Sequence, residues 1–200
     1  MPLHPVPGFK SNFVLINLIR HDLFMILFNG DSWCWGYGLE NRDDRYSAVV
    51  SKKLNIDYSD LSMHGCSNRR IVRTTLEHDI TKYDLGVICM TYKNRTEFHL
   101  NGKWENINPG RGNGRKYIEY YRDYYSEVYG DTDEFIYRQA IIDHFKANGV
   151  KLILLTVPKN TKFRYDLHLD EPDIPRGKTL HPTKEGHSII ASKIISVLQS

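Results

Sequence analysis

The chain of 200 residues has only three cysteines, Cys34, Cys66 and Cys89. An odd and small number of cysteines argues against a disulfide framework and is typical of a reducing compartment, so we expect a cytoplasmic protein. Long apolar runs are also lacking: none approaches the roughly 18 residues of a membrane span, and we expect no membrane partner. The apolar stretch NFVLINLI lacks the basic start and small-residue cleavage site of a secretion signal.

The chain also lacks a large excess of either positive or negative charge. The formal net charge is +3 and the sequence pI is about 8.6, which is too mild to indicate nucleic-acid binding. No linker or repeat interrupts the chain, so one domain is expected at residues 25–200. Residues 1–24 differ from it, because MPLHPVPG cannot be helical. We predict an N-terminal extension there, as a tail, a packing arm or a segment upstream of a second start at Met25.

The hydrophobic pattern predicts buried strands alternating with amphipathic helices. Nearly continuous apolar strands are expected at 25–29, 85–92 and 150–158, with a weaker strand at 57–65 that ends in Gly65. Strands that are apolar throughout need cover on both faces. The fold class predicted is therefore α/β, a three-layer α/β/α sandwich with a parallel sheet. The helices expected between these strands span 45–55, 67–80, 133–149 and 183–199.

Apolar spacing and capping residues define the inner faces and the ends of these helices. Ser67 or Asn68 is expected to cap the second helix, Thr183 to cap the last, and Gly149 to end the third. The side chains predicted to face the sheet are Ile71, Leu76 and Ile80 in the second helix and Phe135, Ile136, Gln139, Ile142 and Phe145 in the third.

Residues suited to acyl transfer follow the predicted strands. Ser32 comes after the first strand in FNGDSWCWGYG, where a turn exposes its hydroxyl and its own N–H. Gly65 ends the next strand, and without a Cβ its N–H can approach a substrate closely. His181, fixed by Pro182 just before the last helix, could accept the proton of Ser32. Since ligands sit at the carboxyl ends of parallel strands, we expect these residues to converge.

Three segments together resemble the blocks of the GDSL/SGNH hydrolases: GDSWCWGYGL with Ser32, MHGCSNRRI with Gly65 and LHPTKEGH with His181. The resemblance spans residues 25–198. It implies a flavodoxin-like sandwich, the SGNH hydrolase fold, and an esterase or acylhydrolase that needs no metal or other cofactor. Carried over to this chain, Ser32 would be the nucleophile, Gly65 an oxyanion donor together with the Ser32 amide, and His181 the general base.

Two positions depart from the family pattern. A Gly-x-Asn should follow the central strand, but Thr91 and Lys93 stand at its glycine and asparagine positions, and Asn94 is one residue too far along. Asn94 is still expected as the third oxyanion donor, which is worth roughly 10²–10³ in rate.

The second departure concerns the acid of the triad. Lys178 replaces the aspartate that should precede His181 by three residues. A main-chain carbonyl could orient the imidazole instead, giving a Ser-His dyad, or Asp173 or Asp170 could fold in from the preceding loop. An efficient enzyme needs one of these substitutes, because loss of the acid costs about 10⁴ in a serine protease.

Several aromatic and basic residues lie near these blocks. Trp33 and Trp35 flank Ser32 as core packing or as a platform for the substrate, and Arg95 pairs with Glu97 or lines the site. His187 is poorly spaced from His181 for metal binding, so it is interpreted as a structural histidine or one at the rim of the site. The loop NPGRGNGRK at 108–116 is interpreted as a surface loop or a basic lid. Most of the tyrosines from Tyr117 to Tyr129 are expected to pack, with a carbohydrate-stacking lid as the alternative.

The predicted function is hydrolysis of an ester, with a small acyl group such as acetyl on a carbohydrate or other polar alcohol. The expected partner is therefore a small-molecule or glycan ester. A weakly active or inactive carbohydrate-binding module on the same fold is the alternative, favoured by Lys93 and Lys178 at the two departures. A nucleotide- or nucleic-acid-binding domain is a third reading, which predicts salt-dependent binding and which we do not favour.

Overall fold

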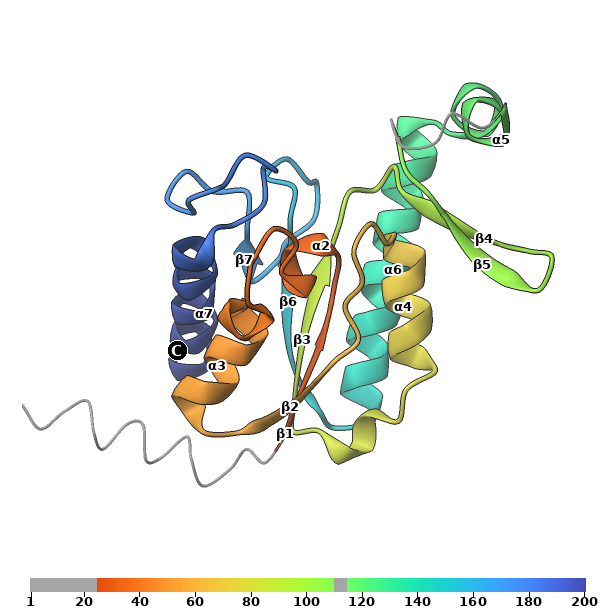
Figure 1. Cartoon of the computed structure of the whole chain (residues 1–200). Coiled ribbons are helices and arrows are strands. Elements are labelled where there is room, and N and C mark those ends of the chain that lie inside the picture. Colours follow the sequence, from red (N-terminus) through yellow and green to blue (C-terminus); the bar gives the residue numbers. More distant parts are fainter. Residues whose placement is uncertain (1–24, 110–114) are drawn as a thin grey trace, which may run out of the picture.

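A five-stranded parallel sheet forms the centre of the computed structural model, which describes residues 25–109 and 115–200 (Figure 1). The strand order is β2-β1-β3-β6-β7, and each neighbouring pair is parallel. The strands are β1 Met25–Asn29, β2 Asp57–Asp60, β3 Leu85–Met90, β6 Lys151–Thr156 and β7 Leu167–His168. The predicted class of fold, an α/β/α sandwich with a parallel sheet, is confirmed.

The sheet is buried on both faces because its central strands are apolar at every position. All six residues of β3 are buried. In β1, Ile26 and Phe28 belong to the hydrophobic cluster on one face, and Leu27 belongs to the cluster on the other. Successive side chains of a strand point to opposite faces, so this unbroken apolar run supplies both halves of the core.

Helices cover the two faces in pairs. Helices α3 (Tyr46–Leu54) and α7 (Lys184–Gln199) lie on one side, and α4 (Asn68–Leu76) and α6 (Glu127–Ala147) lie on the other (Figure 1). The predicted caps are confirmed: Ser67 Oγ accepts from the Arg70 N–H at 3.3 Å, and Thr183 Oγ1 accepts from the Gly186 N–H at 3.2 Å. The short elements are α2 Ser32–Trp35, η1 Arg42–Asp44, η2 Ile80–Lys82, α5 Arg115–Glu119 and the π-helical turn η3 Tyr120–Tyr124.

The inner face of α6 differs from the prediction. The helix begins at Glu127, capped by Ser126, rather than near residue 133. Phe135 and Ile136 were predicted to be inside but are 51% and 52% exposed. The buried residues of this helix are Gly130, Glu134, Ile141 and Phe145. A buried carboxylate and a glycine mark a contact stripe that apolar periodicity alone does not reveal.

Two further boundaries were wrong. Strand β2 ends at Asp60, so Gly65 lies in the following loop. Helix α4 ends at Leu76, which is exposed, because the chain turns away there and Ile80 fills the core from η2 instead. Among the described residues, no helix is long and apolar enough to cross a membrane. The predicted extension at residues 1–24 and the centre of the loop at 108–116 lie outside the described residues.

A β-hairpin separate from the central sheet was not predicted. Strands β4 (Thr96–Leu100) and β5 (Lys103–Ile107) pair antiparallel and project beyond α4 and α6 together with α5 (Figure 1). Asn101 and Gly102 make the turn with φ of 50° and 77°. Asn-Gly is the preferred pair for such a turn because both positions need a positive φ.

His187 is a buried structural histidine of α7. Its Nδ1 accepts from the Tyr46 main-chain N–H at 3.1 Å, so the neutral ring carries its proton on Nε2, which has no hydrogen-bond partner among the described residues. Burial, with a smaller contribution from His181, lowers the pKa of His187 to about 4. The folded protein therefore holds this ring neutral at pH values where an exposed histidine is charged.

Acidification is expected to destabilise the fold through His187. An unfolded histidine has a pKa of about 6.5, so between pH 6.5 and 4 the unfolded chain binds a proton that the folded chain does not. The stabilisation is complete above about pH 6.5 and decreases as the pH falls, by about 2 kcal/mol at pH 5. Denaturant unfolding at pH 7 and pH 5 measures the loss. It should be smaller in His187→Gln than in the exposed control His99→Gln, and equal losses would contradict the assignment.

Candidate active site

Ser32 opens the one-turn helix α2 directly after β1, on a turn that is held by a buried carboxylate. Asp31 Oδ1 accepts from the Trp33 N–H at 2.9 Å and so caps α2. Asp31 Oδ2 accepts from Thr91 Oγ1 at 2.6 Å and from the Arg95 guanidinium at 3.0 Å. The residue before Ser32 is thus tied both to α2 and to the segment after β3, which fixes the position of the hydroxyl.

The same turn depends on a glycine. A Cβ on Gly30 would lie 2.9 Å from the Cβ atoms of both Cys34 and Cys89, closer than such atoms pack. Cys66 completes this cluster, with its Sγ 3.3 Å from the Gly30 carbonyl oxygen. All three cysteines are free and buried, and burial raises the pKa of the Cys66 thiol to about 12. A buried thiol with a raised pKa stays protonated at neutral pH and is a poor nucleophile.

His181 lies beside Ser32 although 149 positions separate them in the sequence. Its Nε2 is 2.8 Å from Ser32 Oγ, and its Nδ1 is 2.7 Å from the main-chain carbonyl oxygen of Thr179. A carbonyl only accepts hydrogen bonds, so Nδ1 carries the ring proton in this pair and Nε2 is left to accept the proton of Ser32. This is the orientation that a general base for a serine nucleophile requires.

The loop before α7 gives His181 this orientation through main-chain bonds. The Gly177 N–H donates to the His181 carbonyl at 2.9 Å, and the Thr183 N–H donates to the Pro175 carbonyl at 2.9 Å. Leu180 adopts a left-handed φ of 60°, which turns the chain between Thr179 and His181. The imidazole is therefore set by the backbone of its own loop.

The two aspartates that were candidates for the triad acid bind cations. Asp170 lies 2.6 Å from Arg176 Nη1, and Asp173 lies 2.9 Å from Lys193 Nζ on α7. The structure therefore pairs Nδ1 of His181 with the carbonyl of Thr179, the first of the alternatives that the sequence left open.

Gly65 lies in the loop between β2 and α4 with a left-handed φ of 73°. Its carbonyl accepts from Asn108 Nδ2 at 2.7 Å, so the end of the hairpin holds the peptide that follows Gly65. Asn108 was not singled out in the sequence. It reaches this loop from the end of a hairpin that was itself not predicted.

The segment after β3 does not carry the donor expected of the family. Lys93 binds Asp131 and also Glu127, the latter at 2.8 Å, both on α6. The main-chain carbonyl of Asn94 accepts from the Tyr121 hydroxyl at 2.7 Å, and Asn94 is one of the residues that line a small hollow together with Lys93. A role for Asn94 as an oxyanion donor stays a prediction.

The residues expected to contact substrate differ in their surroundings. Trp33 is buried, with its ring centroid 6.4 Å from that of His181. Trp35 is half-buried, and the guanidinium of Arg42 covers its ring at 3.5 Å. Arg95 binds Asp31 and supports the turn of Ser32, while Glu97, its predicted partner, binds Arg73 at 2.8 Å. The predicted pair between Arg95 and Glu97 was wrong.

Two aromatic residues beside His181 were not predicted. The ring of Tyr37 stacks on His64 with centroids 4.1 Å apart and planes within 8°, and it lies 4.8 Å from the ring of His181. His64 immediately precedes Gly65, and Tyr37 follows α2. Their place in the GDS and MHG segments was the available signal, but neither residue belongs to the pattern of catalytic residue types.

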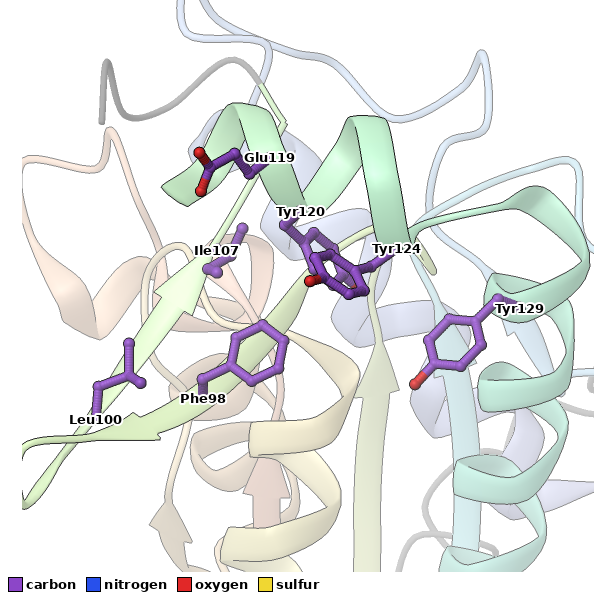
Figure 2. A pocket seen from close by; sticks show the side chains of 7 residues that line it. All are labelled: Phe98, Leu100, Ile107, Glu119, Tyr120, Tyr124 and Tyr129. Carbon is purple, nitrogen blue, oxygen red and sulfur yellow. The ribbon is translucent and has the colours of Figure 1, made fainter. Parts of the chain in front are cut away.

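The tyrosine run borders a separate apolar cavity of about 410 Å³ (Figure 2). Tyr120 is buried, whereas Tyr124 is 73% exposed, so the run is partly packing and partly surface. Phe98 of the hairpin faces these rings, and Tyr129 approaches from α6 (Figure 2). Neither Ser32 nor His181 lines this cavity. Among residues 25–109 and 115–200, no cluster of three or more histidine, cysteine or acidic side chains could hold a metal ion.

Solved structures define the class of this fold. A protein of the G-D-S-L family from Desulfitobacterium hafniense DCB-2 has a TM-score of 0.55 at 14% identity, over 86% of this chain and 98% of its own. The psychrotrophic esterase EstA from Pseudoalteromonas sp. has a TM-score of 0.52 at 13% identity, over 88% and 96%. The chain therefore has the SGNH hydrolase fold that the resemblance implied.

A carbohydrate esterase also shares this fold. A family two carbohydrate esterase from Clostridium thermocellum, solved in complex with cellohexaose, has a TM-score of 0.54 at 13% identity. The match covers 88% of this chain and 63% of that protein, which is therefore considerably longer. No family model and no curated protein sequence matches the chain.

Proposed function

We propose that the chain is a serine esterase that removes a small acyl group, such as acetyl, from a carbohydrate or other polar alcohol. The observation that carries this proposal is the distance of 2.8 Å between Ser32 Oγ and Nε2 of a histidine whose other nitrogen faces a carbonyl. Both residues lie on loops at the carboxyl edge of the sheet, where ligands of such folds bind.

The proposed reaction needs only these two side chains and main-chain donors. Ser32 Oγ attacks the ester carbonyl carbon while its proton passes to Nε2 of His181. The bond to the alcohol then breaks, and His181 returns the proton to the departing oxygen. Water attacks the acyl group on Ser32 in the same way, which releases the acid and restores the hydroxyl. The amides of Ser32 and Gly65 are assigned to the oxyanion, with Asn94 as the third candidate.

The preference for a small acyl group is supported by the walls around His181. The rings of Trp33 and Tyr37 lie 6.4 and 4.8 Å from that of His181, so bulky aromatic groups pack beside the histidine that contacts Ser32. The likeness to a carbohydrate esterase solved with cellohexaose supports a polar alcohol.

A panel of 4-nitrophenyl esters tests the proposal. We expect kcat/KM for the acetate to exceed that for the decanoate by at least about tenfold, because each methylene that cannot be accommodated loses binding energy in the transition state. A preference for the decanoate would overturn the assignment of the acyl group. Acetate release from monoacetylated glucose and xylose would then establish the alcohol.

A carbohydrate-binding module without turnover is the second candidate. Lys93 stands where the family has its third oxyanion donor and is bound to two carboxylates, and such a donor is worth about 10²–10³ in rate. This alternative predicts that well-folded protein binds glycans and hydrolyses no ester of the panel.

A further inference from the structure

A hollow of about 130 Å³ with polar and aromatic walls lies at the same edge of the sheet as Ser32, on the side of β6. Its walls come from the turn after β3, the turn after β6 and the start of α6. Strand β3 lies between β1 and β6. The hollow therefore borders the strand next to β1, which leads into the turn of Ser32. The residues of the wall used below are Tyr92, Asn94, Tyr125, Glu127, Glu134 and Asn160.

Tyr92 connects this hollow to the turn of Ser32. The guanidinium of Arg95 lies 4.9 Å from the ring centroid of Tyr92, and it also binds Asp31, the residue before Ser32. Tyr92 is itself exposed. A ligand whose ester group reaches Ser32 could therefore extend past Tyr92 into the hollow.

A buried carboxylate supplies an acceptor in this wall. Glu134 is only 4% exposed, and both hydroxyl groups that bind it, Thr161 Oγ1 at 2.7 Å and Tyr165 Oη at 2.8 Å, donate to Oε1. That arrangement leaves Oε2 as the oxygen that a ligand hydroxyl can reach. Buried polar groups of a binding site fix the orientation of a ligand in this way.

The other groups of the hollow suit a neutral ligand rich in hydroxyls. The side-chain amides of Asn94 and Asn160 each offer donors and an acceptor. The ammonium of Lys93 is bound to Glu127 and Asp131, so it is partly neutralised and does not favour an anionic ligand. Tyr92 and Tyr125 add aromatic surface, against which the apolar face of a sugar ring packs.

We propose that this hollow is a subsite for one ring of the polyhydroxy alcohol of the substrate, held by the amide of Asn160, Glu134 and the ring of Tyr92. The inference rests on the proposed esterase function of Ser32 and His181. A volume of about 130 Å³ limits the hollow to a compact group such as one ring and excludes a long acyl chain.

Binding to protein that cannot turn over tests the hollow independently of catalysis. Isothermal titration of Ser32→Ala protein with monoacetylated methyl glucoside or xyloside is compared with the same protein carrying Asn160→Ala or Tyr92→Ala. We expect each second change to weaken binding by about fivefold or more, since a lost hydrogen bond or aromatic contact is worth about 1 kcal/mol. Tyr124→Ala, which removes an exposed tyrosine outside the hollow, should leave the affinity unchanged.

Kinetics of the same changes on the native background separate the two proposals. Asn160→Ala should raise KM for the monoacetates and leave kcat/KM for 4-nitrophenyl acetate, which has no polyhydroxy group, within about twofold. If neither Asn160→Ala nor Tyr92→Ala weakened the binding of the monoacetates to the Ser32→Ala protein, the subsite would be overturned. Absence of any hydrolysis by the native protein would instead overturn the esterase function, while the titration still decides whether the hollow binds the sugar.

Discussion

Replacing Ser32 by alanine is expected to lower kcat for 4-nitrophenyl acetate by about 10³-fold or more, with little change in stability. The hydroxyl is the only group removed, and it lies 2.8 Å from Nε2 of His181. Loss of a serine nucleophile leaves only the contribution of binding and of oxyanion stabilisation, and in serine proteases the loss reaches about 10⁶. The rest of the turn, including the cap on Trp33, does not involve this hydroxyl.

Labelling with a fluorophosphonate, read by intact mass, reports the same serine without a substrate. We expect one adduct on the native chain and none on Ser32→Ala. Ser192→Ala is the matched control, because Ser192 is an exposed serine of α7 whose hydroxyl donates to the Ser188 carbonyl. An adduct that persists on folded Ser32→Ala protein would place the reactive group elsewhere, and no adduct on the native chain would favour the binding module.

Asp173→Asn, measured by hydrolysis of 4-nitrophenyl acetate, serves as a second control and distinguishes a dyad from a triad. Asp173 is exposed and pairs with Lys193, and an exposed pair of this kind contributes little to stability, so kcat should stay within about twofold of the native value. If Asp173 instead oriented His181, its loss would cost about 10⁴. The small effect is expected because the Thr179 carbonyl already holds Nδ1.

The sequence predicts the central part of the fold because the buried strands there consist almost entirely of apolar side chains. Strands β1, β3 and β6 are apolar runs that indicate buried strands. The caps Ser67 and Thr183 act through local hydrogen bonds, which short sequence patterns also indicate. Helix α6 was placed less well. It buries Glu134 and leaves Phe135 exposed, which is the opposite of what their side-chain types predict.

The site was predictable to the extent that it consists of side chains in recognisable segments. Ser32, Gly65 and His181 each follow a strand or precede a helix, and their residue types limit what they can do. The partner of His181 could not be predicted, because it is a carbonyl that every residue possesses, and its placement depends on the positive φ of Leu180. Asn108 could not be predicted either, because its contact with Gly65 depends on where the hairpin returns.

Replacing Asp31 is expected to have the largest effect on stability. Its carboxylate is fully buried and receives three groups: the Trp33 N–H, Thr91 Oγ1 and the guanidinium of Arg95, whose side chain is 19% exposed. Asp31→Ala removes the cap and leaves the Arg95 cation with little access to water. Breaking a buried pair in this way costs about 3–5 kcal/mol. In a domain of this size, that corresponds to a fall in Tm of roughly 10 °C.

Two comparisons separate the contribution of the helix cap at Asp31 from that of its ion pair with Arg95. Asp79→Ala removes an exposed aspartate that caps η2 through the Thr81 N–H, so it should cost only the small contribution of one exposed cap. Asp31→Asn keeps an acceptor for the Trp33 N–H but removes the charge that pairs with Arg95, and it should lie between the two. Denaturant unfolding at pH 7 measures all three. Equal losses for Asp31→Ala and Asp79→Ala would mean that the pair with Arg95 contributes nothing.

Because Ser32 follows Asp31 directly, a real contribution of the pair also implies that kcat falls in folded Asp31→Asn protein, through displacement of the Ser32 hydroxyl from Nε2 of His181.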